Sequence, residues 1–144
     1  MAGPILRGEI TPDYMNSRAV GSFIAMMGVT FDRIETGVIT AHMDIRPDHL
    51  APNGFLHAAA VIALADSSCG GATIAHMPKG AENFTTIELK SNHLGTATSG
   101  TLDCLATAAH SGRTTQVWDA VVTSRETAKT IALFRCTQMI LWPK

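Results

Sequence analysis

One long apolar segment, HAAAVIALADSSCGGATIAHM at residues 57–77, constrains the fold more than any other part of the chain. Its first half, Ala58 to Ala65, contains neither Gly nor Pro and only a minority of β-branched residues, so intrinsic propensity favours a helix there. The apolar residues surround this helix instead of forming one stripe. A helix without a polar face must be covered on every side, which predicts a core helix with a sheet wrapped around it.

The segments on either side of this helix have the two-residue alternation of strands. Residues 38–45 alternate apolar and polar side chains, and residues 29–34 are a candidate for a shorter strand before the turn at 35–37. Four more strands are expected after the helix, at about 83–94, 100–110, 114–124 and 130–141. The links between the last three are too short for parallel crossovers, so these strands should form an antiparallel meander.

A second helix is expected near the start of the chain, at residues 11–27. Thr11 and Pro12 suit its N-cap and first turn, and Gly28 ends it. The expected order is thus helix, one or two strands, buried helix and four strands, which is an α+β fold with an antiparallel sheet around a long central helix. No linker, repeat or low-complexity segment divides the sequence, so residues 1–144 are expected to form a single domain.

Composition excludes several classes of protein. Of the 144 residues, 46% are hydrophobic and 16% are charged, which argues against disorder, and the formal net charge is −1 without any run of Lys or Arg. Nucleic acid and anionic membrane surfaces are therefore poor partners. No segment resembles a signal peptide, and no window of about 18 residues is both free of charge and apolar enough to span a bilayer.

The cysteine and histidine residues have no spacing that predicts a metal site or a disulfide framework. Cys69, Cys104 and Cys136 are widely spaced among apolar neighbours, which favours buried reduced thiols and a reducing cytoplasm over disulfides or zinc ligands. No two of the six His have a ligand-like spacing, so no metal site is expected.

Asp66 is the one charged residue of the apolar segment. An isolated carboxylate is costly in such surroundings. Burial should raise its pKa and suit it to proton transfer or to attack on an acyl carbon. The alternative is a structural role, in which Asp66 ends the apolar half of the helix and bonds to the hydroxyls of Ser67 or Ser68 or to a basic partner.

His57 stands nine residues before Asp66, at the start of the same helix. Nine residues correspond to about 900° of rotation and about 13 Å of rise, so the two side chains point to opposite faces and cannot pair within one subunit. If both act, two subunits related by a twofold axis must share the site. The free N–H groups of Ala58 and Ala59 at the helix start could then polarise a thioester carbonyl. The alternative for His57 is a capping or packing role.

The segment HLAPNGFLHAAAVIALADSSCGGA resembles the loop and helix of hotdog-fold acyl-CoA thioesterases of the phenylacetate-pathway (PaaI-like) type. Their pattern is N-P-x-G-x-x-H-G-G followed by an apolar helix with an acidic residue nine positions after the His. Pro52, Gly54, His57 and Asp66 match it, and the resemblance continues through FTTIELKSNHLGTATSG and HSGRTTQVWDAVV, over roughly residues 28–141. It implies a sheet of five or six antiparallel strands around the helix, in homodimers with two interface sites that often pair into homotetramers.

The resemblance also implies roles for individual residues. Asp66 would be the catalytic carboxylate, the amide of Ala58 the oxyanion hole, and His57 would orient the carbonyl. Arg113, after the turn Ser111-Gly112, would contact phosphates of coenzyme A, for which a guanidinium is well suited, with an ordinary exposed turn residue as the alternative.

Several positions depart from the family pattern. Ala58 and Ala59 replace the two glycines after the His, and the added methyl groups narrow the approach to the amides. Ala51 stands where an Asn or Gln is common, so Asn53, next to Gly54, is the neighbouring amide that could replace it for substrate binding. Gly70 replaces a hydroxyl residue four positions after the acid, so Ser67 or Thr86 is expected to hold the attacking water instead.

The sequence therefore predicts an acyl-CoA thioesterase that needs no metal or redox cofactor, since coenzyme A is part of the substrate. Two alternatives stay open: a non-catalytic hotdog module that binds acyl-CoA, and an enoyl-acyl hydratase or dehydratase, which the spacing of His57 and Asp66 disfavours. The identity of the acyl group is not encoded in any motif of the chain.

Overall fold

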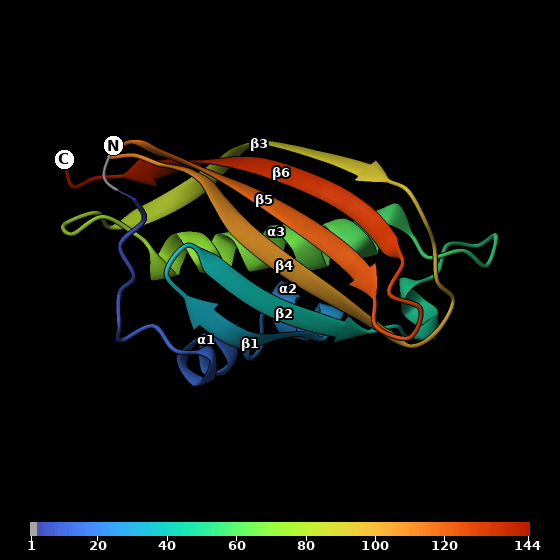
Figure 1. The fold of residues 1–144 in the computed structure, drawn as a ribbon. Helices are drawn as coiled ribbons and strands as arrows, with labels where there is room; N and C mark the ends of the chain where they lie inside the picture. Colours follow the sequence, from blue (N-terminus) through green and yellow to red (C-terminus); the bar gives the residue numbers. More distant parts are fainter. Residues whose placement is uncertain (1–2) are drawn as a thin grey trace.

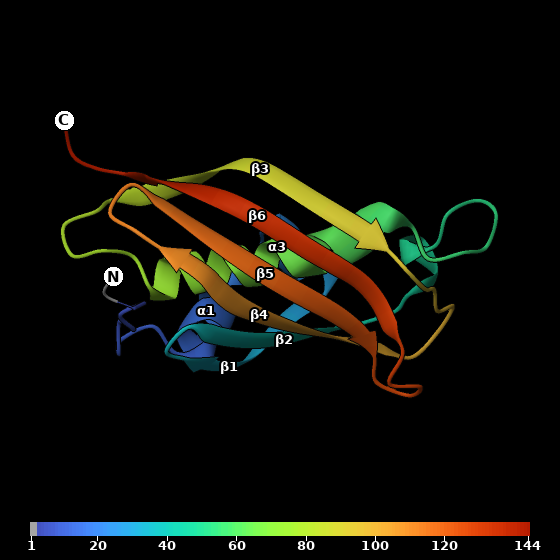
Figure 2. The ribbon, with the colours of Figure 1, turned by 45° about the horizontal axis from the view of Figure 1, so that its top comes forward.

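The computed structural model describes residues 3–144. The elements follow in the order α1 (Pro12–Ala19), α2 (Phe23–Met27), β1 (Val29–Glu35), β2 (Val38–Asp44), a 3-10 turn (Pro47–His49), α3 (Ala58–Ala75), β3 (Asn83–His93), β4 (Thr101–Ser111), β5 (Thr115–Ser124) and β6 (Thr130–Leu141). The six strands form one antiparallel sheet, in the order β1-β2-β4-β5-β6-β3, that curves around α3 (Figure 1, Figure 2). The predicted α+β arrangement is confirmed.

The strands lie close to their predicted positions because their alternating patterns define one buried face. The four strands after α3 begin and end within one residue of the predicted bounds, and the candidate strand at 29–34 is β1. Strands β4, β5 and β6 form the predicted meander, and every second residue of β5 is buried. Strand β3 is different: it pairs only with β6, at one edge of the sheet, and most of its residues are exposed on both faces.

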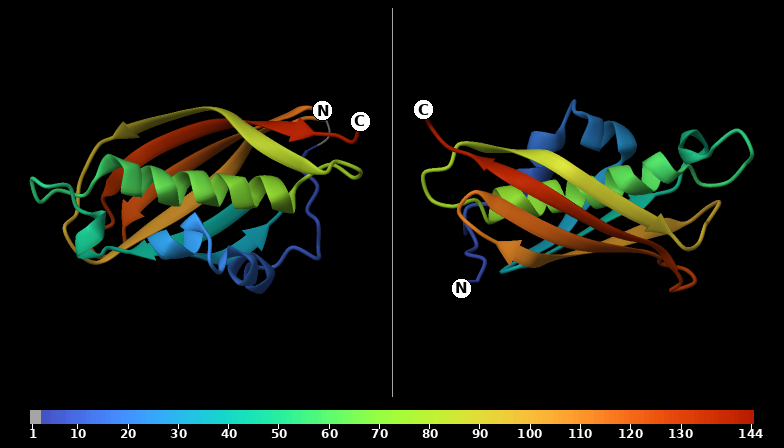
Figure 3. Two further views of the ribbon diagram at one scale, coloured as in Figure 1. Left: turned by 180° about the vertical axis from the view of Figure 1, so that it is seen from behind. Right: turned by 90° about the horizontal axis from the view of Figure 1, so that it is seen from above.

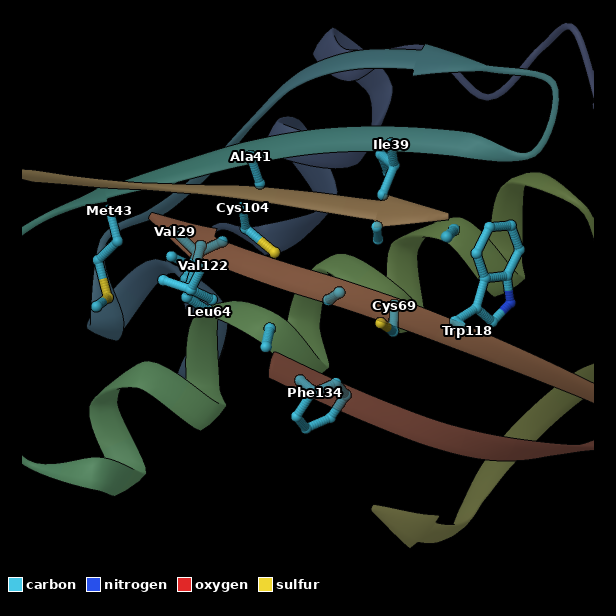
Figure 4. Close-up of a cluster of buried hydrophobic side chains, with 14 of the residues drawn as sticks. Val29, Ile39, Ala41, Met43, Leu64, Cys69, Cys104, Trp118, Val122 and Phe134 are labelled. Atoms are coloured by element: carbon cyan, nitrogen blue, oxygen red, sulfur yellow. The ribbon is translucent and has the colours of Figure 1, made fainter. Parts of the chain in front are cut away.

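Helix α3 is the middle of three layers, with the sheet on one side and α1 and α2 on the other (Figure 3). Side chains from the sheet and α3 meet in one hydrophobic cluster (Figure 4), which includes Val29, Ile39, Leu64, Cys69, Cys104, Trp118, Val122, Phe134 and Cys136. Burial of each large apolar side chain stabilises the fold by about 1.5–3 kcal/mol. The three cysteines are free and buried, as predicted.

The apolar character of α3 approaches that of a membrane-spanning helix. By length and composition α3 could cross a membrane, because its 18 residues have a mean hydropathy of 1.4. The segment contains the charged residue Asp66, so it is not a charge-free apolar window of the kind that the sequence excludes. Within the fold, 61% of this helix is buried by the sheet and the other helices. Its hydropathy is thus accounted for by its place in the core.

The single helix expected at 11–27 is two helices in the structure. Thr11 caps α1, accepting the N–H of Tyr14 at 3.1 Å, and Gly28 ends α2 at a φ of +77°, so both ends were predicted correctly. The break falls at Gly21, whose φ is also +77°, and the following residue, Ser22, is the N-cap of α2. The break lets α1 pack mainly against β1 while α2 packs against both α3 and β1 (Figure 3).

A buried polar network fixes the C-terminal end of α3. The N–H of Gly37 donates to Nε2 of His76 at 2.9 Å, so Nδ1 carries the ring proton and donates to the Ala72 carbonyl at 2.8 Å. The carbonyl of His76 accepts from Nε2 of Gln116, whose Oε1 accepts from Nε1 of Trp118. Both ring nitrogens find these partners only in the neutral form, and burial lowers the pKa of His76.

Candidate active site

The loop before α3, residues 50–56, is closed by backbone hydrogen bonds between its two sides. Leu50 and Leu56 form an isolated antiparallel bridge, and the N–H of Ala51 donates to the Phe55 carbonyl at 2.7 Å. At the exposed tip, Oδ1 of Asn53 accepts the N–H of Phe55, and Gly54 has a φ of +84°. In this subunit Asn53 and Gly54 therefore shape the turn, and contact with a substrate stays a prediction.

His57 is the N-cap of α3. Its Nδ1 accepts the N–H of Ala59 at 3.0 Å, so in the neutral ring the proton lies on Nε2. The capping role weighed as the alternative is thus present, but it leaves Nε2–H as a donor at an exposed position. It also corrects one expectation: the N–H of Ala59 is not free, because the His57 ring already occupies it.

Ala58 keeps the free amide that the sequence predicted. Within residues 3–144, its N–H has no acceptor, while the next three amides donate to the ring or carbonyl of His57. The residue is exposed, so its methyl group does not bury the N–H. A free amide at the positive end of a long helix, beside the His57 Nε2–H, can stabilise an oxyanion.

Asp66 lies in the middle of α3 and is half-buried, and among residues 3–144 its buried Oδ1 has no hydrogen-bond partner. Burial raises the pKa of this carboxyl above its ordinary value. Neither Ser67 nor Ser68 bonds to it: the Ser68 hydroxyl donates to the Leu64 carbonyl instead, and Ser67 is buried. The purely structural explanation for Asp66 therefore lacks the partners it requires.

Asp66 shares its face of α3 with small and apolar residues. Ile62, Gly70 and Ile74, at four-residue intervals from Asp66 or from one another, are the other half-buried residues of the helix beyond its first turn. Beside this face is the edge strand β3, where Ile87 is 52% and Leu89 41% exposed. The carboxylate thus sits in an apolar strip that one subunit leaves uncovered.

We infer that Thr86 lies near Asp66, from the register of α3 against β3. A Cβ added to Gly70 would be 3.4 Å from the Phe84 ring, and α3 and β3 run in opposite directions (Figure 1). Asp66 lies one turn before Gly70 on α3, and Thr86 lies two residues after Phe84 on β3. The Thr86 hydroxyl donates to Oε1 of the buried Gln138 at 2.7 Å, which leaves its lone pairs free to accept from a water.

Arg113 lies at the opposite end of α3 from His57, in the turn between β4 and β5. Its guanidinium stacks on the Trp142 ring at 4.6 Å, and Nε1 of Trp142 donates to the Arg113 carbonyl at 3.0 Å. An open pocket of about 660 Å³ borders Arg113 and is also lined by Arg7 and Lys79. Neither His57 nor Asp66 lines this pocket.

One subunit therefore brings together some of the predicted residues and separates others. Asp66, Ser67 and Thr86 lie near the middle of α3, whereas His57 and Ala58 lie at its start, about 13 Å away along a continuous helix. The sequence did not single out Gln138 or Trp142. Both act through side-chain contacts between distant strands and turns, for which the sequence pattern carries no signal.

Among residues 3–144, no three or more His, Cys, Asp or Glu side chains are grouped so as to hold a metal ion.

The family model called Thioesterase superfamily matches residues 53–131, more than half of the chain. The chain is 29% identical over 133 residues to the Pseudomonas aeruginosa esterase PA1618, with 91% of each protein covered. It is 30% identical over 112 residues to a 1,4-dihydroxy-2-naphthoyl-CoA hydrolase of Listeria monocytogenes, covering 77% of this chain and 89% of that protein.

Solved structures show the same fold. A variant of the Pseudomonas aeruginosa thioesterase PA1618 superposes with a TM-score of 0.88 at 27% identity, covering 94% of this chain and 97% of that one. The Escherichia coli PaaI protein of the phenylacetic acid degradation operon superposes with a TM-score of 0.77 at 20% identity, covering 88% of each chain. The predicted hotdog fold is confirmed.

Proposed function

The chain belongs to the thioesterase superfamily, and from that premise we propose that it hydrolyses an acyl-CoA thioester to a free carboxylic acid and coenzyme A. The observation that carries this proposal is Asp66, a carboxylate with a buried, unpartnered oxygen in an apolar strip. Since no partner in the subunit uses that oxygen, it is free to act on a water molecule or on the acyl carbon itself.

In the proposed reaction, the thioester carbonyl oxygen lies at the start of α3. The free N–H of Ala58 and the Nε2–H of His57 donate to it as negative charge develops. In one route Asp66 accepts a proton from water, whose oxygen attacks the carbonyl carbon, and Asp66 then passes that proton to the departing thiolate. In the other route the Asp66 carboxylate attacks the carbon itself, and water then hydrolyses the resulting acyl-aspartyl anhydride to the free acid and restores Asp66. In both routes the C–S bond breaks, and the thiolate leaves as coenzyme A. Coenzyme A is part of the substrate, and the proposed chemistry needs no other cofactor.

The site is proposed to be shared between two copies of the chain. His57 and Asp66 are half a turn out of alignment and about 13 Å apart along α3. In the proposed site, His57 of one subunit therefore acts together with Asp66 of the second subunit. The uncovered strip around Asp66 and the free edge of β3 support a homodimer as the minimal unit. A homotetramer and a reducing, cytoplasmic location are further expectations, the latter supported by the buried thiols.

Other predicted residues have supporting positions. Thr86, with its hydroxyl proton directed to Gln138, is proposed to accept a hydrogen bond from the attacking water, and Ser67 is the alternative residue for this role. Arg113, held against Trp142 beside Arg7 and Lys79, is proposed to contact phosphates of coenzyme A. Asn53 and Gly54 are proposed to shape the loop against the substrate of the shared site.

The test is release of free thiol from a panel of acyl-CoAs that includes phenylacetyl, benzoyl, 1,4-dihydroxy-2-naphthoyl, butyryl, octanoyl and palmitoyl groups. The naphthoyl compound is included because the Listeria monocytogenes relative is named as its hydrolase. We expect turnover of at least one member that disappears in Asp66→Ala. Binding of acyl-CoA without turnover in the folded wild type would instead support the acyl-CoA-binding module. Hydration of an enoyl-CoA, without thiol release, would support the hydratase.

A further inference from the structure

His49 is a buried histidine that the proposed reaction does not use. Its side chain is 1% exposed, in the 3-10 turn just before the loop that leads to α3. Nδ1 accepts the N–H of Arg46 at 3.2 Å, so the neutral ring carries its proton on Nε2. Nε2 is buried and, among residues 3–144, makes no hydrogen bond within 3.5 Å, although the Met27 carbonyl is near enough to influence the ring. A buried imidazole with one unpaired donor is costly, so its retention needs an explanation.

The position of His49 connects its ring to the start of α3. The His49 carbonyl accepts the N–H of His57 at 2.9 Å, which closes the base of the loop between them. The His49 ring accepts the Arg46 N–H and so closes the 3-10 turn (Pro47–His49), which positions the His49 carbonyl for this hydrogen bond. On its other side, the Arg46 side chain donates to the Met26 carbonyl at the end of α2. One small cluster thus joins α2, the turn and the N-cap of α3.

Only the neutral ring can make this connection. A second proton would place an N–H on Nδ1, facing the Arg46 N–H, so that two donors would oppose each other. The charged groups around the ring are the Arg46 guanidinium and the Asp48 carboxylate, whose Oδ1 is 3.9 Å from Nε2. α2 contains no charged residue, and Asp66 is the only one on α3.

We propose that His49 is a positioning residue: its neutral ring holds the 3-10 turn and, through it, His57 and the Ala58 amide, and acid releases them. Burial and the Arg46 guanidinium lower the pKa of His49, more than Asp48 and the Met27 carbonyl raise it, which keeps the ring neutral near pH 7. The inference rests on the proposed function only for its effect on turnover.

The experiment compares three full-length proteins: wild type, His49→Asn and His49→Leu. An Asn oxygen can occupy the place of Nδ1 and accept the Arg46 N–H without titrating, whereas Leu removes the acceptor. Amide hydrogen exchange gives protection factors for Arg46 and His57 at pH 7.5 and 5, and the kcat/KM of the best acyl-CoA substrate is measured over the same range.

We expect the protection of Arg46 and His57 in the wild type to fall severalfold, up to about tenfold, as the pH falls through the folded pKa of His49, which corresponds to the loss of one hydrogen bond. Protection should persist in His49→Asn and be low at both pH values in His49→Leu. At pH 7.5, His49→Leu should lower kcat about tenfold or more with little change in KM, because the oxyanion donors are misplaced. His49→Asn should rescue much of this loss and move the acid limb of the profile to lower pH.

His76→Gln is the matched control, since His76 is also a buried neutral histidine but lies at the other end of α3. It should leave the protection of His57 unchanged. An equal acid loss of protection in His49→Asn and wild type, or full protection in His49→Leu, would overturn the inference. The exchange results do not depend on turnover, so a failure of the thioesterase proposal would appear separately, as absent thiol release.

Discussion

Asp66 is the single residue whose burial lowers the stability of the folded state most clearly. Its pKa is raised by burial, so the folded state binds a proton more readily than the unfolded state. The contribution of Asp66 to the free energy of unfolding is therefore least favourable at a pH above its folded pKa, where the buried carboxyl group must ionise. Residues that act in catalysis often lower stability in this way.

Asp66→Asn should therefore stabilise the protein while removing activity. We expect kcat to fall about 10²–10⁴-fold, the usual contribution of a general base. The midpoint of thermal unfolding should rise at pH 8, by roughly 2–4 °C for each kcal/mol added to the free energy of unfolding. It should rise less at pH 4, where more of the Asp66 carboxyl is already neutral. Asp119→Asn is the control, because Arg135 holds the pKa of Asp119 below its usual range. A lower midpoint for Asp66→Asn at pH 8 would contradict this account.

His76 should make stability depend on pH in the opposite direction. Its folded pKa is lowered by burial, so the unfolded state binds more protons just below pH 6.5. The stabilisation is complete above that pH and is lost as the pH falls through the folded pKa. Urea unfolding at pH 7.5, 6.5 and 5.5 should show a shallower loss in His76→Gln than in the wild type. Equal losses would show that the network around His76 does not titrate as described.

At the scale of elements, two adjacent glycines of α3 have different neighbours. A Cβ on Gly71 would lie 2.6 Å from Cε1 of Phe31, whereas one on Gly70 would be 3.4 Å from the Phe84 ring. Gly71→Ala should therefore lower the thermal midpoint, because Phe31 is buried and cannot move freely. Gly70→Ala should leave it unchanged or raise it, since Ala favours helix by about 1 kcal/mol over Gly. The reverse order would contradict this packing.

Much of this arrangement could be predicted from the sequence, because elements with strong periodicity define their own faces. The strands of the meander were predicted within one residue, and α3 was predicted as a helix from its intrinsic propensity and as the core helix from its apolar composition. The break at Gly21 was missed, since a glycine inside a helical pattern does not by itself show that the chain changes direction. The occupied amide of Ala59 was also missed, because it depends on the orientation of the His57 ring.

At the scale of the whole molecule, the exposed edge of β3 predicts a second subunit. Ile87→Glu should place a charge in the proposed interface, convert the proposed dimer to a monomer and lower activity by at least about tenfold. Light scattering after size exclusion, with thiol release on the same fractions, measures both effects. Leu105→Glu, on the outer face of the sheet, is a control that should keep the dimer. A fully active Ile87→Glu monomer would contradict the shared site.

Subunit mixing tests whether the thioester is hydrolysed at a site shared by two subunits. Asp66→Ala and His57→Ala are each expected to be inactive alone, but a heterodimer contains one site with both native residues. After random exchange, half of the dimers are mixed and half of their sites are intact, so thiol release should recover to about one quarter of the wild-type rate. Mixing Asp66→Ala with Asp66→Asn should recover nothing. No recovery in verified heterodimers of the first pair would contradict hydrolysis at a shared site.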